Sequence, residues 1–175
     1  MSYLITASLL NSWRNLEKEY VLEQDFLKVL HRKPIEQTVS MIKGYEFEEW
    51  AVNHLPYLQG GQYQVKLSKQ YGDYLLYGIV DVLKAGIVYD LKYTSRYDVG
   101  KYRGNTQTVM YLTLVPEAHK MIYVASNDEK GNGVIWQEEY SRDEIEPLDA
   151  LLYNFRNWLE ATKLWNVYID LWRAR

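Results

Sequence analysis

Hydrophobic and polar positions follow two different periods along the chain, and these periods predict helices near both ends and strands in the middle. Five segments either alternate apolar with polar residues or are rich in β-branched, aliphatic and aromatic residues, as strands are. These predicted strands are residues 62–68, 74–83, 87–93, 121–125 and 134–139. Ala85 and Gly86 are typical of a tight turn, so we expect the second and third strands to form a hairpin.

Four segments have the apolar spacing or the terminal residues of helices. These predicted helices are residues 8–30, with Ser8 as N-cap, residues 34–55, with Pro34 in the first turn, residues 104–116, ended by Pro116, and residues 148–172. Serine at the N-cap and proline in the first turn are both favoured at helix starts. The last segment is long enough to predict one amphipathic helix of about seven turns.

The order of these elements predicts an α/β (α+β) fold, with a small mixed sheet of about five strands flanked by helices. A chain of 175 residues is expected to bury about 70 % of the surface that its unfolded form exposes, which predicts a single domain. Its expected parts are a helical N-terminal part (about 1–58), a core (about 60–140) and a C-terminal helix (about 148–173).

Composition excludes several functional classes. The chain has no cysteine, so disulfides, iron–sulfur clusters and cysteine nucleophiles are excluded, and any metal must bind oxygen or imidazole ligands. No apolar run approaches about 18 residues, and the start of the chain lacks a basic region and a cleavage site, so we expect a cytoplasmic protein with no membrane partner. The net charge of −3 gives no global basic field, so nucleic-acid binding would need a local patch.

Charged residues interrupt the apolar pattern of the predicted hairpin. If residues 85–86 form its turn, Asp81 lies directly opposite Asp90, and both carboxylates project from one face, which Lys92 shares. Opposed side chains have Cβ atoms about 4.5–5.5 Å apart, so two carboxylates there repel each other unless a cation lies between them. The pattern favours a divalent metal site, and its alternative is an open sheet face with three solvated charges.

Two neighbouring segments carry further candidate residues. Residues 92–103 combine basic side chains with tyrosines, a composition suited to phosphate contact and base stacking, although a solvated loop is the alternative. The basic residues are Lys92, Arg96, Lys101 and Arg103. On the second predicted helix, Glu46, Glu48 and Glu49 lie among aromatic residues, and one of them could add a metal ligand.

Four short motifs in this order resemble those of the PD-(D/E)XK nuclease superfamily, in particular the branch of RecB-like nuclease domains and phage λ-type exonucleases. The motifs are Gly44-x-x-x-Glu48-x-x-Ala51, Gly78-Ile79-Val80-Asp81, Asp90-Leu91-Lys92 and Gln107-Thr108-Val109-Met110-Tyr111. Val80 replaces the proline of the family name, and the lack of cysteine removes the iron–sulfur cluster of some relatives. The resemblance implies a restriction-endonuclease-like core.

The resemblance also implies a function, which is Mg²⁺-dependent hydrolysis of phosphodiester bonds in DNA, with Mn²⁺ as a substitute metal. An exonuclease associated with a phage or mobile element is the expected kind. The implied catalytic residues are Glu48, Asp81, Asp90, Lys92 and Gln107. The metal would bind Asp81, Asp90, the Leu91 carbonyl and Glu48, and DNA would contact Arg96, Lys101, Arg103 and Tyr111.

Two other functions fit parts of the pattern. Paired carboxylates also serve glycosidases, and aromatic residues could line a sugar cleft, but Lys92 has no general role in that mechanism. A catalytically silent protein that keeps the nuclease fold and binds nucleic acid or protein is the second alternative. Trp158, Trp165 and Trp172 recur every seven residues, so the C-terminal helix would either pack in the core or join copies of the chain into an oligomer.

Overall fold

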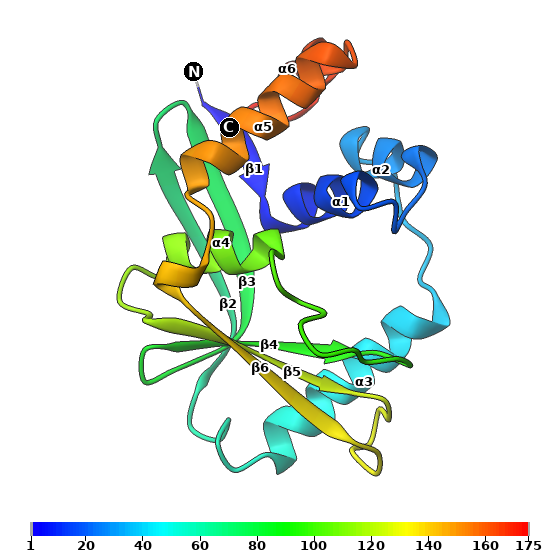
Figure 1. The fold of residues 1–175 in the computed structure, drawn as a ribbon, viewed down its shortest axis with the longest axis vertical. Helices are drawn as coiled ribbons and strands as arrows, with labels where there is room; N and C mark the ends of the chain where they lie inside the picture. Colours follow the sequence, from blue (N-terminus) through cyan, green and yellow to red (C-terminus); the bar gives the residue numbers. More distant parts are fainter. Residues whose placement is uncertain (1, 175) are drawn as a thin grey trace.

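A mixed sheet of six strands with flanking helices forms the centre of the computed structural model, which describes residues 2–174 (Figure 1). In chain order the elements are β1 (Tyr3–Thr6), α1 (Ala7–Glu17), α2 (Glu23–Leu30), α3 (Val39–His54), β2 (Gln62–Tyr71), β3 (Tyr74–Lys84), β4 (Ile87–Tyr93), α4 (Thr106–Leu114), β5 (Lys120–Ser126), β6 (Ile135–Ser141), the 3-10 helix η1 (Arg142–Glu144), α5 (Leu148–Ala161) and α6 (Trp165–Leu171). The expected fold class is confirmed, and β1 is the strand that the hydrophobic pattern did not predict.

Strand β3 is the branch point of the sheet. Residues 74–77 of β3 pair in parallel with β1, and residues 82–84 pair antiparallel with β4. Strand β2 pairs with the opposite edge of β3, and β5 joins β4 to β6. Among the described residues, none forms a ladder pair with residues 78–81 on the edge that β1 and β4 share. The sheet is therefore interrupted beside the segment that carries Asp81.

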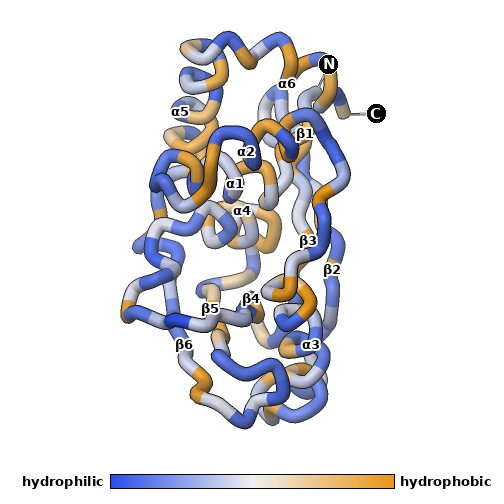
Figure 2. Tube along the Cα trace, turned by 90° about the vertical axis from the view of Figure 1, so that its right-hand side faces the viewer, coloured by the Kyte–Doolittle hydropathy of each residue, from blue (hydrophilic) through white to orange (hydrophobic). Residues whose placement is uncertain are grey.

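Two apolar clusters hold the helices against the sheet. The larger cluster joins α1, α4 and α5 to the sheet around the fully buried Trp13, Phe155 and Tyr168, and Figure 2 shows hydrophobic stretches in each of these helices. The smaller cluster places Phe47 and Ala51 of α3 against β3, β4 and β5. Within residues 2–174, none of the helices combines the length and the apolar character that crossing a membrane requires.

The first two predicted helices begin and end at other residues than expected. Thr6 and not Ser8 is the N-cap of α1, and Glu19 has a left-handed backbone conformation (φ +58°) that separates α1 from α2. The next helix, α3, is capped by the Thr38 side chain, so Pro34 lies outside it. A side-chain cap that accepts a backbone N–H determined the start of both helices.

The expectation of one C-terminal helix at residues 148–173 was wrong, because this segment forms α5 and α6. Lys163 has a φ of +62°, and the Thr162 hydroxyl donates a hydrogen bond to the Trp158 carbonyl at 2.8 Å. Such local bonds compete with helix continuation. The buried Trp172 donates its indole N–H to the Leu30 carbonyl at 2.7 Å. Trp172 thus packs within the chain, and an oligomer through this region stays a prediction.

Candidate active site

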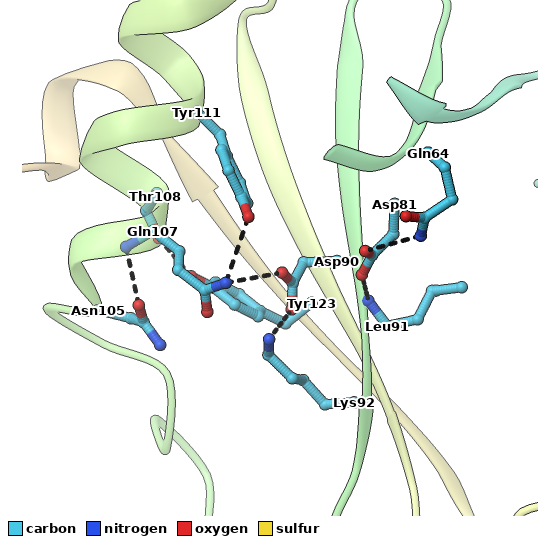
Figure 3. A network of polar contacts seen from close by, with 10 residues as sticks. All are labelled: Gln64, Asp81, Asp90, Leu91, Lys92, Asn105, Gln107, Thr108, Tyr111 and Tyr123. Atoms are coloured by element: carbon cyan, nitrogen blue, oxygen red, sulfur yellow. Dashed lines mark hydrogen bonds and ion pairs between the residues drawn. The ribbon is translucent and has the colours of Figure 1, made fainter. Parts of the chain in front are cut away.

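The four sequence motifs meet at one pocket beside the interruption of the sheet, and Figure 3 shows residues of three of them. The pocket has a volume of about 320 Å³, and all the predicted catalytic and metal-binding residues line it, together with Tyr111. They come from four elements: Glu48 from α3, Asp81 from β3, Asp90, Leu91 and Lys92 from β4, and Gln107 and Tyr111 from α4. The fold therefore gathers residues that are widely separated along the chain.

The hairpin register agrees with the predicted register as far as the ladder extends. Strands β3 and β4 pair from their turn as far as Val82 and Tyr89, and the next step of the same register sets Asp81 opposite Asp90. The ladder stops at this step, and Asp81 Oδ2 accepts a hydrogen bond from the Leu91 N–H at 2.8 Å. A carboxylate thus satisfies a backbone donor that a continued ladder would otherwise satisfy.

Helix α4 lies close to the interruption because Gly78 has no side chain. A Cβ at this position would lie only 2.8 Å from Cε1 of Tyr111. Asn105 caps α4 by accepting the Gln107 N–H at 2.8 Å, which fixes the start of the helix. Gln107 Nε2 then donates to Asp90 Oδ1 and to the Tyr111 hydroxyl, each at 3.4 Å (Figure 3). The glycine and the cap together place the Gln107 side chain beside the aspartates.

Burial raises the pKa of the three carboxyl groups in this pocket. Desolvation, followed by repulsion from Asp90 and Glu48, raises the pKa of Asp81 to about 8. Desolvation also raises the pKa of Asp90 and that of Glu48. Lys92 Nζ lies 2.7 Å from Asp90 Oδ2, and although burial disfavours the ammonium, attraction by Asp90 and Asp81 keeps the Lys92 pKa above its usual value. One ammonium among three carboxylates leaves a net negative charge when all are ionised.

The chemistry of the pocket fits a hard divalent cation. It offers carboxylate oxygens, and Gln107 Oε1 is a buried acceptor without a hydrogen-bond partner among residues 2–174. In the arrangement described for those residues, no group of three or more acidic, histidine or cysteine side chains is placed to hold one ion. Mg²⁺ retains several waters and commonly binds one or two carboxylates together with substrate phosphates, so two carboxylates such as Asp81 and Asp90 would be enough as protein ligands.

Gln64 belongs to this site although no sequence pattern singled it out. It lies on β2 between the residues paired with Val80 and Val82, hence opposite Asp81. Its Nε2 donates to Glu48 Oε1 and lies 3.5 Å from Asp81 Oδ1. Its φ of +50° is left-handed, a conformation that costs a residue with a side chain about 1–2 kcal/mol. Backbone strain of this kind concentrates at functional sites.

We expect Gln64→Gly to be more stable than Gln64→Ala. Glycine adopts positive φ without a Cβ clash, which favours it by about 1 kcal/mol over alanine at this position. Gln62 is the matched control, because it lies in the same strand without a positive φ, so Gln62→Gly should be less stable than Gln62→Ala. Thermal unfolding of the four variants measures both differences. The same order of stability at both positions would contradict strain at Gln64.

The basic residues of the segment between β4 and α4 lie beside the site. Lys101 and Arg103 line a second pocket of about 700 Å³, which also includes Lys92 and Gln107 of the first. Lys18, the residue that caps the C-terminus of α1, adds a fourth cation to its lining. The larger pocket therefore continues from the carboxylates into a positively charged recess.

Two of the residues expected to contact DNA are placed differently. The Arg96 side chain is 84 % exposed, pairs with Asp98 at 3.3 Å and lines neither pocket. The Tyr111 side chain is buried, and its hydroxyl accepts a hydrogen bond from Gln107 within the smaller pocket. The contact of Tyr111 with DNA stays a prediction, and only the part of its side chain that lines this pocket could make it.

Comparison with solved structures identifies the class of fold. The chain is similar to SSO0001, with 18 % identity, a TM-score of 0.59, and 92 % of this chain and 77 % of that chain covered. It is similar to an alkaline exonuclease (LHK-Exo) from Laribacter hongkongensis, with 15 % identity, a TM-score of 0.57, and 95 % and 89 % covered. A phage related exonuclease from Haemophilus somnus 129PT gives 13 % identity, a TM-score of 0.56, and 98 % and 96 % covered.

These matches confirm the expected fold, which the chain shares with an alkaline exonuclease and a phage related exonuclease. No protein-family model matches the chain, and no curated protein matches it in sequence. Because a shared fold at such low identity does not fix activity, the function must be argued from the pocket.

Proposed function

We propose that this protein is a divalent-metal-dependent DNA nuclease with exonuclease activity, associated with a phage or mobile element. The observation that carries the proposal is the pocket itself, in which Asp81, Asp90 and Lys92 meet at an interrupted sheet edge beside groups from two helices. The fold that the chain shares with two exonucleases supports the same activity. Mg²⁺ is the proposed metal, with Mn²⁺ as a substitute, and DNA is the proposed partner.

The two aspartates and the lysine would act directly on the reacting phosphate. Asp81 and Asp90 would hold Mg²⁺, which supplies Lewis-acid stabilisation of phosphate charge and lowers the pKa of an attacking water. Lys92 is kept protonated by its ion pair with Asp90, so its ammonium would stabilise the negative charge that develops on the phosphate.

Glu48 and Gln107 would orient water in the pocket. Burial raises the pKa of Glu48, which makes its carboxylate a better proton acceptor for a water hydrogen bond. Gln107 Nε2 fixes the Asp90 carboxylate, and its buried Oε1 is free among the described residues to accept a hydrogen bond from water. Both side chains would hold the nucleophile in line with the phosphate.

A digestion series tests the proposed function. End-labelled linear duplex, circular duplex and single-stranded DNA are incubated with Mg²⁺ or with a chelator. Progressive loss of linear DNA with Mg²⁺ alone, while circular DNA stays intact, is the expected result. Cleavage of circular DNA would replace exonuclease with endonuclease activity, and binding without cleavage would favour the catalytically silent alternative. The absence of both DNA binding and DNA cleavage would overturn the proposal.

DNA affinity should depend on the basic residues beside the site. Replacing Arg96, Lys101 and Arg103 together by alanine is expected to lower the log–log salt slope of binding by up to about 3 units, because each phosphate contact releases about one counterion. Since Lys101 and Arg103 line the larger pocket and Arg96 does not, most of the change should come from those two.

Fluorescence anisotropy of labelled DNA in chelator measures this slope over a range of potassium chloride concentrations. Arg96→Ala is the matched control, and we expect its slope to stay near that of the wild type. An unchanged slope in the Lys101→Ala, Arg103→Ala double variant would contradict the assignment. Binding would then have to use another surface, for which Lys66 and Lys69 of β2 are the next candidates.

A further inference from the structure

Glu138 of β6 is a buried carboxylate that accepts hydrogen bonds from three successive backbone N–H groups. Its Oε1 accepts from Gly100 at 2.8 Å and Lys101 at 3.1 Å, and its Oε2 accepts from Tyr102 at 3.1 Å. Successive N–H groups that converge in this way form an anion-binding concavity. In this chain a carboxylate of the neighbouring sheet fills that concavity.

Two tyrosine hydroxyls complete the shell around the same carboxylate. Tyr97 donates to Glu138 Oε1 and Tyr140 donates to Oε2, each at 2.6 Å. Burial acts to raise the pKa of Glu138, but these hydrogen bonds outweigh it and hold the pKa below its usual value. Glu138 therefore stays ionised at neutral pH, when each of its charge-assisted hydrogen bonds is strong.

The donors belong mainly to the connecting segment, residues 94–105 between β4 and α4, which has no helix or strand of its own. Aromatic contacts hold both ends of the Glu138 shell, because Tyr97 stacks on Trp136 at 4.7 Å between ring centres and Tyr102 stacks on Tyr123 at 4.6 Å. Glu138 is bonded to the middle of this segment, so its charge fixes the path of the backbone between the two stacks.

The path of the connecting segment determines two features of the site. It places Lys101 and Arg103 in the lining of the larger pocket, and it ends at Asn105, the cap of α4. The cap in turn sets the position of Gln107 beside the aspartates. Glu138 itself lines neither pocket, so its effect on them must pass through this backbone.

We propose that Glu138 is a positioning residue that holds the connecting segment in the form that binds DNA phosphates. The proposal rests on the proposed function, because it adds a residue to the DNA-binding part of the same site. Its physical basis is that irregular backbone next to a charged pocket needs fixed partners, and one ionised carboxylate accepts four hydrogen bonds from this segment.

Glu138→Gln tests this role with little change of shape. The amide keeps one acceptor oxygen but sets an NH₂ group against backbone N–H donors, so part of the shell is lost. Glu139→Gln is the matched control, because Glu139 is the next residue, undergoes the same change of charge and forms only an exposed ion pair with Lys120 at 2.8 Å. Tyr97→Phe removes a single hydrogen-bond donor to Glu138, and it replaces Glu138→Gln as the test if that variant does not fold.

Hydrogen exchange reports whether the segment is held. In Glu138→Gln the amides of Gly100, Lys101 and Tyr102 are expected to exchange at least about tenfold faster, while β5 amides keep their wild-type rates. Tyr97→Phe should accelerate the same three amides less, and Glu139→Gln should leave them unchanged. Faster exchange in β5 to the same extent would indicate loss of the whole fold and would overturn a local positioning role.

DNA affinity, measured in chelator at low salt, reports whether the held form is the binding form. If the freed segment adopts that form about a tenth of the time, the Kd of Glu138→Gln rises about tenfold. Calorimetry should find Mg²⁺ affinity within about twofold of the wild type, because Glu138 lies outside the carboxylate pocket. Tyr97→Phe should give an intermediate Kd, and Glu139→Gln the wild-type Kd.

Two results would overturn the inference. Wild-type exchange of the three amides in both Glu138→Gln and Tyr97→Phe would mean that Glu138 does not hold the segment. Faster exchange with wild-type DNA affinity would mean that the held form is not needed for binding. If the wild-type protein itself fails to bind DNA, the proposed function is wrong, and the binding role proposed for Glu138 is wrong as well. If the wild type binds DNA, the results of the variants test the role of Glu138 alone.

Discussion

Asp81→Asn is expected to abolish Mg²⁺-dependent cleavage and to stabilise the metal-free protein at the same time. The asparagine oxygen can still accept the Leu91 N–H, so the local structure is kept. The lost charge removes a metal ligand, and we expect cleavage to fall by at least about 100-fold. Active-site groups often cost stability, so a gain in stability together with a loss of activity is the combination expected of a catalytic carboxylate that is buried beside other carboxylates.

The stability gain has a defined pH dependence. The pKa of Asp81 is raised to about 8 in the folded protein, mainly by desolvation, whereas an unfolded aspartate has a pKa of about 3.9. Between these values the folded state keeps a proton that the unfolded state has lost, so wild-type stability falls as pH rises. Asp81→Asn lacks this loss, and we expect it to be more stable by about 1–3 kcal/mol at pH 8 and by much less at pH 4.

Thermal or urea unfolding in chelator at the two pH values measures this gain, and calorimetry measures Mg²⁺ binding. Asp73→Asn is the matched control, because Asp73 is an exposed turn residue next to the start of the same strand. Asp90→Asn should also lose cleavage but should not gain stability, because it leaves the Lys92 ammonium without its 2.7 Å partner. Cleavage by Asp81→Asn within a few-fold of the wild-type rate would refute the site assignment.

The sequence predicts the central hairpin and its chemistry because both depend on short-range patterns. Strand periodicity and the Ala85-Gly86 turn together fix the register, and the register alone sets Asp81 opposite Asp90. The structure confirms that register and adds that the ladder stops at the aspartates. Gly78 belongs to one of the motifs, but its physical reason, the approach of Tyr111 to within 2.8 Å of a Cβ, is visible only in three dimensions.

Helix breaks and the supporting residues of the site were not predictable in this way. Glu19, Gln64 and Lys163 adopt positive φ although their residue types give no signal of it. Tertiary packing and side-chain hydrogen bonds determine these positions, and a periodicity argument contains neither. Glu138 and Glu139 are adjacent in β6 and so point to opposite faces of the sheet, and the fold of the connecting segment covers the face of Glu138.

Lys92→Met is expected to lower cleavage by about 100-fold or more while Mg²⁺ still binds. Methionine keeps most of the aliphatic stem and removes the charge that would stabilise the phosphate in the transition state. Without the ammonium, Asp90 stays buried without its ion-pair partner, so the metal-free variant should be less stable than the wild type. Mg²⁺ should bind as tightly or more tightly, because a competing cation has gone, and it should therefore raise the melting temperature more than in the wild type.

Melting temperatures with and without Mg²⁺, calorimetry and the digestion assay together separate a catalytic from a structural lysine. Lys120→Met is the matched control, because Lys120 lies on the adjacent strand β5 and pairs with the exposed Glu139. It should keep wild-type cleavage and the wild-type response to Mg²⁺. Loss of Mg²⁺ binding together with cleavage in Lys92→Met would mean that Lys92 builds the site and does not act in it, and undiminished cleavage would remove Lys92 from the mechanism. A cleavage defect with tighter Mg²⁺ binding is the one combination that requires the ammonium to act on the phosphate, because the carboxylates would then be fully competent without it.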